Sequence, residues 1–202
     1  MIRIECKFEA SISRQELDDY IRGLQLSVIA YTYDGMEVVL GRMGADQLLL
    51  TAAETDAADL HCICDNDSEA MNLLVAALFD ENYSFQAELE VNENTDHVLF
   101  LWHSVFHPKL RPFQSSILNT LSEMFGNDCA MVMRRKACDL DDKELADLGF
   151  KKIAGTDFVF RHLAYLNEYS RAHPQGAEVP DDFEADEEDA EWVRERWDIE
   201  DE

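Results

Sequence analysis

The sequence has few basic side chains: 17 lysines and arginines stand against 43 aspartates and glutamates in 202 residues, a formal net charge of −26 at pH 7. Such a charge repels nucleic-acid phosphates and anionic lipids, so we expect no binding to nucleic acid and none to a membrane. It favours basic partners or high solubility. The acids extend over the whole chain and are densest in residues 176–202.

Long apolar runs are also missing. No run of about 18 apolar residues occurs, which excludes a membrane-spanning helix of the usual kind. Residues 1–7 lack the apolar core and the small-residue cleavage site of a secretory signal. The 5 cysteines are an odd set whose spacing suggests no disulfide framework. These absences predict a cytoplasmic protein with reduced thiols.

The familiar catalytic motifs do not occur. There is no G-x-S-x-G, H-E-x-x-H or Walker-type run. His61, Cys62 and Cys64 supply at most half of the about four ligands that a zinc site needs, so we expect no metal site. Cys138 is a weak candidate nucleophile because no base partner can be assigned to it.

The chain does contain a regular succession of strand and helix patterns. A half-buried strand is expected at 2–8, and a helix at 13–24 after a Ser-x-x-Glu capping pattern. Strands 26–33 and 36–42 flank Asp34-Gly35, a strong hairpin signal. Further elements are a helix that begins near Ser68, a strand at 97–106 that is apolar on both alternations, a helix at 115–125, a buried strand at 129–134, a short helix that begins at Asp141, and strands at 150–153 and 157–163.

This order predicts an α/β or α+β protein with a mixed sheet. We expect one domain over residues 1–171. Residues 172–182 contain Pro174, Gly176 and Pro180 and are a linker by composition. Residues 183–202 form an acidic tail that contains two tryptophans.

The tail has a helical pattern of its own. Phe183, Ala190, Val193 and Trp197 fall on one face if residues 183–198 are helical. Such a helix can pack on its own domain or on a second copy in a homodimer. Alternatively, it binds a basic partner protein through its acids and tryptophans.

Two segments in the second half of the chain carry a family resemblance. Residues 107–116 read His-Pro-Lys-Leu-Arg-Pro-Phe-Gln-Ser-Ser after the central strand, and residues 148–150 read Leu-Gly-Phe before the closing strands. With Gly-Thr-Asp-Phe at 155–158, this layout resembles the GNAT (Gcn5-related N-acetyltransferase) superfamily over about 97–163. The resemblance implies a GNAT-like, mostly antiparallel mixed central sheet flanked by helices.

The resemblance also implies an acetyl-CoA site between strands 97–106 and 129–134. The pyrophosphate would rest on the start of the following helix, where unpaired N–H groups attract anions. A backbone N–H near Ser104 or Val105 would polarise the acetyl carbonyl. The implied phosphate-turn residues are Arg111, Phe113, Gln114, Ser115 and Ser116.

Candidate bases for an incoming amine are His103 on the central strand and the carboxylate of Glu88 or Glu90. The alternative for His103 is a hydrogen-bonded strand histidine. His107 begins the turn and is expected to cap or pack. Arg111 either touches a phosphate or pairs with an acid.

The expected acetyl-CoA site has departures from the family pattern. The family's turn has an Arg or Gln followed by x-x-Gly-x-Gly or Ala, whereas Gln114 and Ser116 occupy its glycine positions here. Pro112 removes one N–H donor, and Leu145 stands where many members have a proton-donating tyrosine. The turn could instead be a simple connection capped by serine.

We therefore expect a GNAT-like protein with a degenerate acetyl-CoA site that serves as an interaction or regulatory module. The alternative is an acetyl-CoA-dependent N-acetyltransferase that acts on a small amine or a basic protein. A third hypothesis, an acidic imitation of nucleic acid, rests on the net charge alone.

Overall fold

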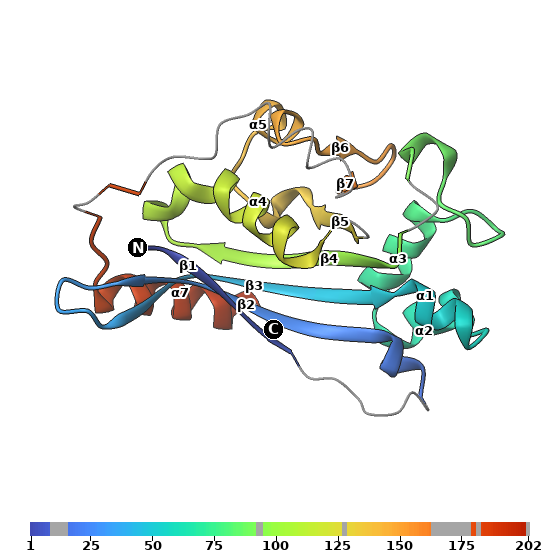
Figure 1. Ribbon diagram of the computed structural model, residues 1–202, viewed down its shortest axis with the longest axis horizontal. Coiled ribbons are helices and arrows are strands. Elements are labelled where there is room, and N and C mark those ends of the chain that lie inside the picture. The colour runs from blue at the N-terminus through green and yellow to red at the C-terminus, as the bar shows by residue number, and fades with distance from the viewer. Residues whose placement is uncertain (9–15, 92–94, 127–128, 163–178, 181–182, 201–202) are drawn as a thin grey trace.

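The computed structural model describes residues 1–8, 16–91, 95–126, 129–162, 179–180 and 183–200. Within them, one open sheet has seven strands in the order β1-β2-β3-β4-β5-β7-β6 (Figure 1). All neighbours are antiparallel except β4 and β5. The strands are β1 Arg3–Phe8, β2 Ile21–Tyr31, β3 Glu37–Leu49, β4 His97–Phe106, β5 Cys129–Arg134, β6 Lys151–Lys152 and β7 Phe158–His162.

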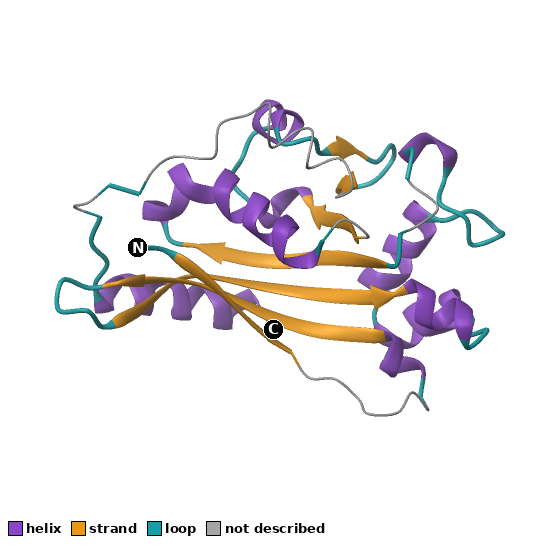
Figure 2. Ribbon diagram, in the orientation of Figure 1, coloured by secondary structure: helices purple, strands orange, loops and turns teal. Residues whose placement is uncertain are grey.

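Helices cover both sides of this sheet, as Figure 2 shows. The predicted class, a mixed α/β protein, is confirmed; the finer GNAT-like fold stays a prediction. The α-helices are α1 Leu50–Thr55, α2 Leu60–Asp67, α3 Glu69–Leu78, α4 Gln114–Phe125, α5 Asp142–Asp147 and α7 Glu187–Glu200. The 3₁₀-helices are η1 Leu17–Tyr20, η2 Ala87–Leu89, η3 Pro108–Phe113 and η4 Arg135–Ala137.

The sheet separates two hydrophobic cores. On the side that we call the α4 face, Leu26 and Leu99 pack with Leu118 of α4. On the other side, the α3 face, Phe100 and Val132 pack with the helices α1 to α3. β4 contributes to both cores, which confirms the prediction of a strand buried on both faces.

The hairpin prediction is confirmed, and its strands are longer than expected. β2 and β3 meet at Asp34-Gly35, where Gly35 has a φ of +84°. A left-handed residue suits the tight reversal, and glycine adopts it without steric cost. β3 extends to Leu49, through part of the region 43–66 that has little pattern in the sequence.

The helix predicted at 13–24 is wrong over its described part. Residues 17–20 form only the short η1, and β2 begins at Ile21. The spacing of Leu17, Tyr20, Ile21 and Leu24 is compatible with a helix, but β2 pairs with β1 on one side and with β3 on the other. Two ladders outweigh a local helical pattern. The predicted start, at 13–15, lies outside the described residues.

The helices α3, α4 and α5, which begin at Glu69, Gln114 and Asp142, agree with the predictions. The Ser68 hydroxyl accepts a hydrogen bond from the Met71 N–H and caps α3. Asp141 and Glu144 form a capping box at the start of α5. α4 ends at Gly126, which has a φ of +81°. These signals are local, so the sequence alone was sufficient to find them.

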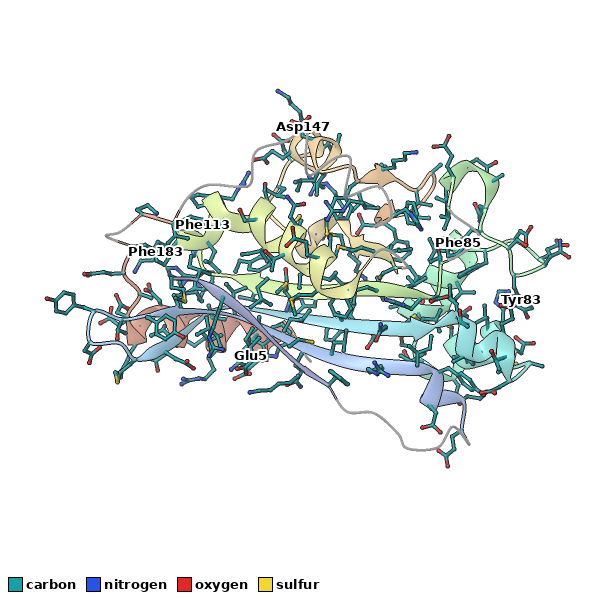
Figure 3. All side chains as sticks on the ribbon, in the orientation of Figure 1. Glu5, Tyr83, Phe85, Phe113, Asp147 and Phe183 are labelled. Atoms are coloured by element: carbon teal, nitrogen blue, oxygen red, sulfur yellow. The ribbon has the colours of Figure 1, made fainter. Side chains whose placement is uncertain are left out.

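The acidic tail packs on its own domain. α7 and α4 lie on opposite sides of the sheet (Figure 1), and α7 contacts β3 and β4. Val193 is fully buried, and Ala190 is half-buried, as the helical pattern predicts. Just before α7, Phe183 lies against Phe113 of η3, with ring centroids 5.4 Å apart (Figure 3). Of the linker predicted at 172–182, all but 179–180 lies outside the described residues.

None of the helices in the described part of the chain combines the length and the apolar character that crossing a bilayer requires.

Candidate functional site

The candidate site forms where β4 continues past the end of β5. The two strands pair as far as Leu101 and Met133, whereas β4 continues to Phe106. On its other edge β4 pairs with β3, and the register shifts after Gly44, which leaves Trp102 as an extra residue in β4. Such a bulge bends a strand and changes the direction of its side chains.

At the bulge, the side chains of Trp102 and His103 both line the α3 face. Trp102 lies over Gly44, where a Cβ would overlap its indole ring, so the close approach requires glycine. Trp197 of α7 packs on both bulge residues: its ring centroid lies 6.4 Å from that of Trp102 and 5.0 Å from that of His103. The C-terminal helix therefore helps to hold this part of β4.

A cleft of about 460 Å³ opens beside the bulge on the α3 face. It lies between the α2–α3 junction and the middle of the sheet. Its walls combine carboxylates, aromatic rings, an imidazole and a guanidinium. The lining residues are Asp46, Asp67, Ser68, Ala70, Phe100, Trp102, His103 and Arg134.

Asp46 is the most perturbed acid of the cleft. It lies in β3 between Gly23 of β2 and Phe100 of β4, and it is half-buried. Burial, followed by repulsion from the Asp67 carboxylate, raises the pKa of Asp46 to about 7. Among the described residues, its carboxylate has no hydrogen-bond or ion-pair partner.

Arg134 supplies the positive group at the cleft. It is the last residue of β5, and its side chain is exposed. In the described part of the chain, its guanidinium forms no ion pair, whereas Nε of the next residue, Arg135, donates to Oδ1 of Asp142 at 2.7 Å. The guanidinium of Arg134 can therefore donate hydrogen bonds to an anion.

On the α4 face, described side chains connect the two segments where β4 and β5 separate. The Ser104 hydroxyl donates to the backbone carbonyl of Ala137 in η4 and so joins the two diverging segments. Ala137, Cys138 and Leu140 are buried in the α4-face core. The segment after β5 therefore contacts β4 beyond the point at which the pairing of the two strands ends.

Gln114 occupies the first of the two glycine positions in the family's phosphate turn, and its side chain bonds to another part of the chain. Its Nε2 donates to Oδ2 of Asp139 at 2.9 Å, and its Oε1 accepts from the Asp139 N–H at 3.0 Å. The side chain is almost completely buried. A glycine at this position would leave this space empty, so Gln114 connects α4 to the segment after β5.

Arg111 pairs with an acid. Its Nη2 donates to Oε2 of Glu144 at 2.7 Å, and this hydrogen bond lowers the pKa of Glu144. The carboxylates of Asp139 and Asp141 also act on the Arg111 charge. Of the two roles predicted for Arg111, the structure contains the ion pair.

The other predicted cofactor residues lie in or beside this region. Val105 is buried in β4 opposite Arg42 of β3. Phe113 is buried at the end of η3, and Ser115 and Ser116 are half-buried in the first turn of α4. Their binding to acetyl-CoA stays a prediction.

The connection before α4 is capped by histidine rather than by serine. The N-cap residue of α4, Phe113, makes no side-chain cap bond. His107 is the N-cap residue of η3, and its Nδ1 accepts from the Lys109 N–H at 3.3 Å. Nε2 of His107 lies 3.2 Å from Oδ1 of Asp189, which is in the first turn of α7. His107 therefore caps and packs, as predicted.

The two predicted catalytic residues lie apart. His103 lines the cleft from β4. Glu90 follows η2 and pairs with Lys151 of the edge strand β6, with 2.5 Å between Nζ and Oε2. The strands β5 and β7 lie between β4 and β6, so Glu90 belongs to another part of the surface.

The cysteines lie in ordinary structural positions. Burial raises the pKa of Cys64 to about 12 and also raises that of Cys138. Cys64 is fully buried, whereas its neighbours His61 and Cys62 are exposed. Over the described ranges, no three His, Cys, Asp or Glu side chains are grouped so as to hold a metal ion.

The sequence-based prediction missed Asp46, Asp67 and Arg134. Asp46 follows Met-Gly-Ala and precedes Gln-Leu-Leu-Leu, so an acid inside an otherwise strand-like run was the available signal. It was missed because the strand predicted at 36–42 ends before Asp46 and residues 43–66 have little regular pattern. No local pattern connects these residues to Arg134.

Comparisons of the chain with protein-family models, with curated proteins and with solved structures found no match.

Proposed function

We propose that the chain is a GNAT-like protein without acetyltransferase activity, which acts as a binding or regulatory module and takes a small amine in the cleft of the α3 face. The observation that carries the proposal is the pair of hydrogen bonds between Gln114 and Asp139. These bonds put a buried side chain where the resemblance predicts a pyrophosphate. Binding acetyl-CoA there would require Gln114 to leave its partner and become solvent-exposed.

The GNAT-like part of the proposal is supported by the order and geometry of the second half of the chain. β4 and β5 are parallel, α4 connects them, and their pairing stops before the end of β4. The bulge at Trp102 lies at that point. The local sequence pattern at 148–150 and 155–158 supports the same likeness.

The loss of acetyl-CoA binding is also supported by charge. A pyrophosphate at the start of α4 would compete with Glu144 for Arg111 and would lie close to Asp139 and Asp141. Like charges at this separation repel unless a cation compensates for them. Leu145, at the position of the family's tyrosine, is buried in the core and has no proton to donate.

The amine part of the proposal is supported by the chemistry of the cleft. Asp46 and Asp67 present carboxylates beside the rings of Phe100 and Trp102. Carboxylates pair with an ammonium group, and an aromatic face attracts a cation. A volume of about 460 Å³ lies in the range of small-molecule sites.

We propose the cytoplasm as the location of this protein. The proposal is supported by the free state of Cys6, Cys62, Cys64, Cys129 and Cys138, each of which is among the described residues.

Calorimetric titrations with acetyl-CoA and with a primary amine test the proposed function. We expect no binding of acetyl-CoA at millimolar concentration and no release of CoA thiol when the amine is added. We expect the amine to bind by itself. Micromolar binding of acetyl-CoA that is abolished by Arg111→Ala, or steady CoA release, would establish the acetyltransferase alternative instead.

A further inference from the structure

The cleft of the α3 face contains groups of both charges. Asp46 approaches it from β3, and Arg134 approaches it from the end of β5. Neither side chain has a hydrogen-bond or ion-pair partner within the described ranges. A partly buried charge such as that of Asp46 is stabilised by a partner of opposite charge, and the exposed guanidinium of Arg134 can form a bidentate pair with a carboxylate. A ligand that carries both charges would satisfy both residues.

We propose that the cleft binds a small zwitterion, an amino-acid-like molecule whose ammonium lies at Asp46 and Asp67 and whose carboxylate lies at Arg134. This inference rests on the proposed function, in which the cleft takes an amine, and it names the chemical class of that amine.

The sheet places the two anchors at a suitable separation. Phe100 of β4 pairs with Asp46 of β3 and with Val132 of β5. Arg134 follows Val132 by two residues, so both side chains extend from the same face. Two strand spacings across the sheet and two residues along β5 put Asp46 and Arg134 roughly 12 Å apart at the backbone. The long arginine side chain shortens this gap to one that a small molecule can bridge, with a hydrogen bond of about 2.8 Å at each end.

The side chains around the anchors match the remaining parts of such a ligand. The guanidinium of Arg134 presents paired N–H donors whose geometry fits a carboxylate. Asp46 and Asp67 together accept the several N–H donors of an ammonium group. Between the anchors, Phe100 and Trp102 provide apolar surface for the carbon skeleton.

The pKa of Asp46 agrees with an ammonium partner. Burial and the Asp67 carboxylate raise it to about 7, because both disfavour the ionised form of Asp46 when the cleft is empty. A bound ammonium favours the ionised carboxylate and offsets the repulsion between Asp46 and Asp67.

Matched sets of probes separate the contributions of the two charges. The first set is phenylalanine, 2-phenylethylamine and 3-phenylpropanoate, and the second is leucine, 3-methylbutylamine and 4-methylpentanoate. Each set keeps the carbon skeleton and removes either the carboxylate or the ammonium. Calorimetry on the full-length chain is expected to give an affinity at least about tenfold higher for the zwitterion than for the amine. The acid alone is expected not to bind.

Two variants with matched controls assign the anchors. Arg134→Gln should reduce the affinity for the zwitterion to that for the amine and leave the amine affinity unchanged. Its control is Arg135→Gln, which removes the same charge from a residue that pairs with Asp142 outside the cleft. Asp46→Asn should reduce the affinity for the zwitterion and the affinity for the amine by the same factor. Its control is Asp65→Asn, on α2 but not on the cleft.

The outcomes distinguish this inference from the function on which it rests. If amine and zwitterion bind equally well and Arg134→Gln changes neither, the carboxylate anchor is wrong and the amine site remains. If neither binds, the amine site itself is wrong. Tighter binding of O-phosphoethanolamine than of either amino acid would overturn the assignment of a carboxylate. Circular dichroism of each variant verifies that it is folded.

Discussion

The two faces of the sheet differ most where β4 continues past the end of β5. On the α4 face, Ser104 bonds to Ala137, and Gln114 bonds to Asp139 across the same gap. On the α3 face, a cleft remains, and in the described part of the chain Asp46 has no polar partner. We call the face with these hydrogen bonds the closed side and the face with the cleft the open side.

The difference shows that a motif and a site need not coincide. The turn at 107–116 carries the family resemblance, but its polar side chains bond to other parts of the chain, such as Glu144 and Asp139. Asp46 and Arg134 belong to no motif, and yet they are the groups that a ligand can satisfy. Polar groups removed from water normally have partners, so the half-buried Asp46 marks a place to look for binding, and the exposed Arg134 lies beside it on the cleft.

The largest effect on stability is expected from the closed side. Gln114→Ala removes both hydrogen bonds to Asp139 and leaves a small cavity at an almost fully buried position. We expect the free energy of unfolding to fall by about 2–3 kcal/mol, as measured by urea denaturation.

Ser116→Ala is the matched control because Ser116 occupies the other predicted glycine position and is half-buried. This substitution should change the unfolding free energy by less than about 0.5 kcal/mol. Equal effects of the two substitutions would remove the distinction between a structural glutamine and an ordinary turn residue.

A smaller effect on stability, of opposite sign, is expected from replacing Asp46 on the open side. The folded-state pKa of Asp46, about 7, lies above its ordinary value of 3.8, so ionising Asp46 costs the folded state stability as the pH rises between these values. Asp46→Asn removes this cost. We expect it to stabilise the protein by about 2 kcal/mol near pH 8, after allowance for screening by solvent, and hardly at all near pH 4.

Thermal unfolding of the wild type and the variant at several pH values measures this difference. Asp65→Asn, which changes an exposed acid on α2, should show no such dependence on pH. A stabilisation by Asp46→Asn that is the same at pH 4 and pH 8 would contradict the raised pKa.

The smallest effect is expected at the residue that matches the family motif best. Arg111 pairs with Glu144 at 2.7 Å, but both side chains are well exposed, at 41% and 38%. An exposed ion pair contributes about 0–1 kcal/mol, so Arg111→Ala should lower the unfolding free energy by less than about 1 kcal/mol. High salt should reduce the effect further. A loss above about 2 kcal/mol in urea denaturation would show that Arg111 is part of the core network of the closed side.

Much of the fold could be predicted from local patterns. The hairpin at Asp34-Gly35, the doubly buried β4, and the capped starts of α3 and α5 all depend on residues close in sequence. The helix predicted at 13–24 failed because pairing with β1 and β3, both distant in sequence, determined the state of residues 21–24. Local spacing cannot report such pairing.

The candidate site was less accessible to prediction. His103 was identified on the central strand, and it does line the cleft. Its carboxylate companions were not found, because Asp46 and Asp67 come from a strand and a helix end that only the folded chain brings together. Glu90, the acid that was predicted, pairs with Lys151 near the edge of the sheet.

The sequence by itself determined the acidity, the α/β class, the central strand and the amphipathic pattern of the C-terminal helix, because composition and periodicity are properties of the chain alone. The tertiary structure decided which polar groups find partners. In the folded chain, Gln114 forms hydrogen bonds with Asp139, and Arg111 forms an ion pair with Glu144. Asp46 and Arg134 line the cleft. Hydrogen bonds and desolvation depend on neighbours in space, and those neighbours exist only after the sheet has formed.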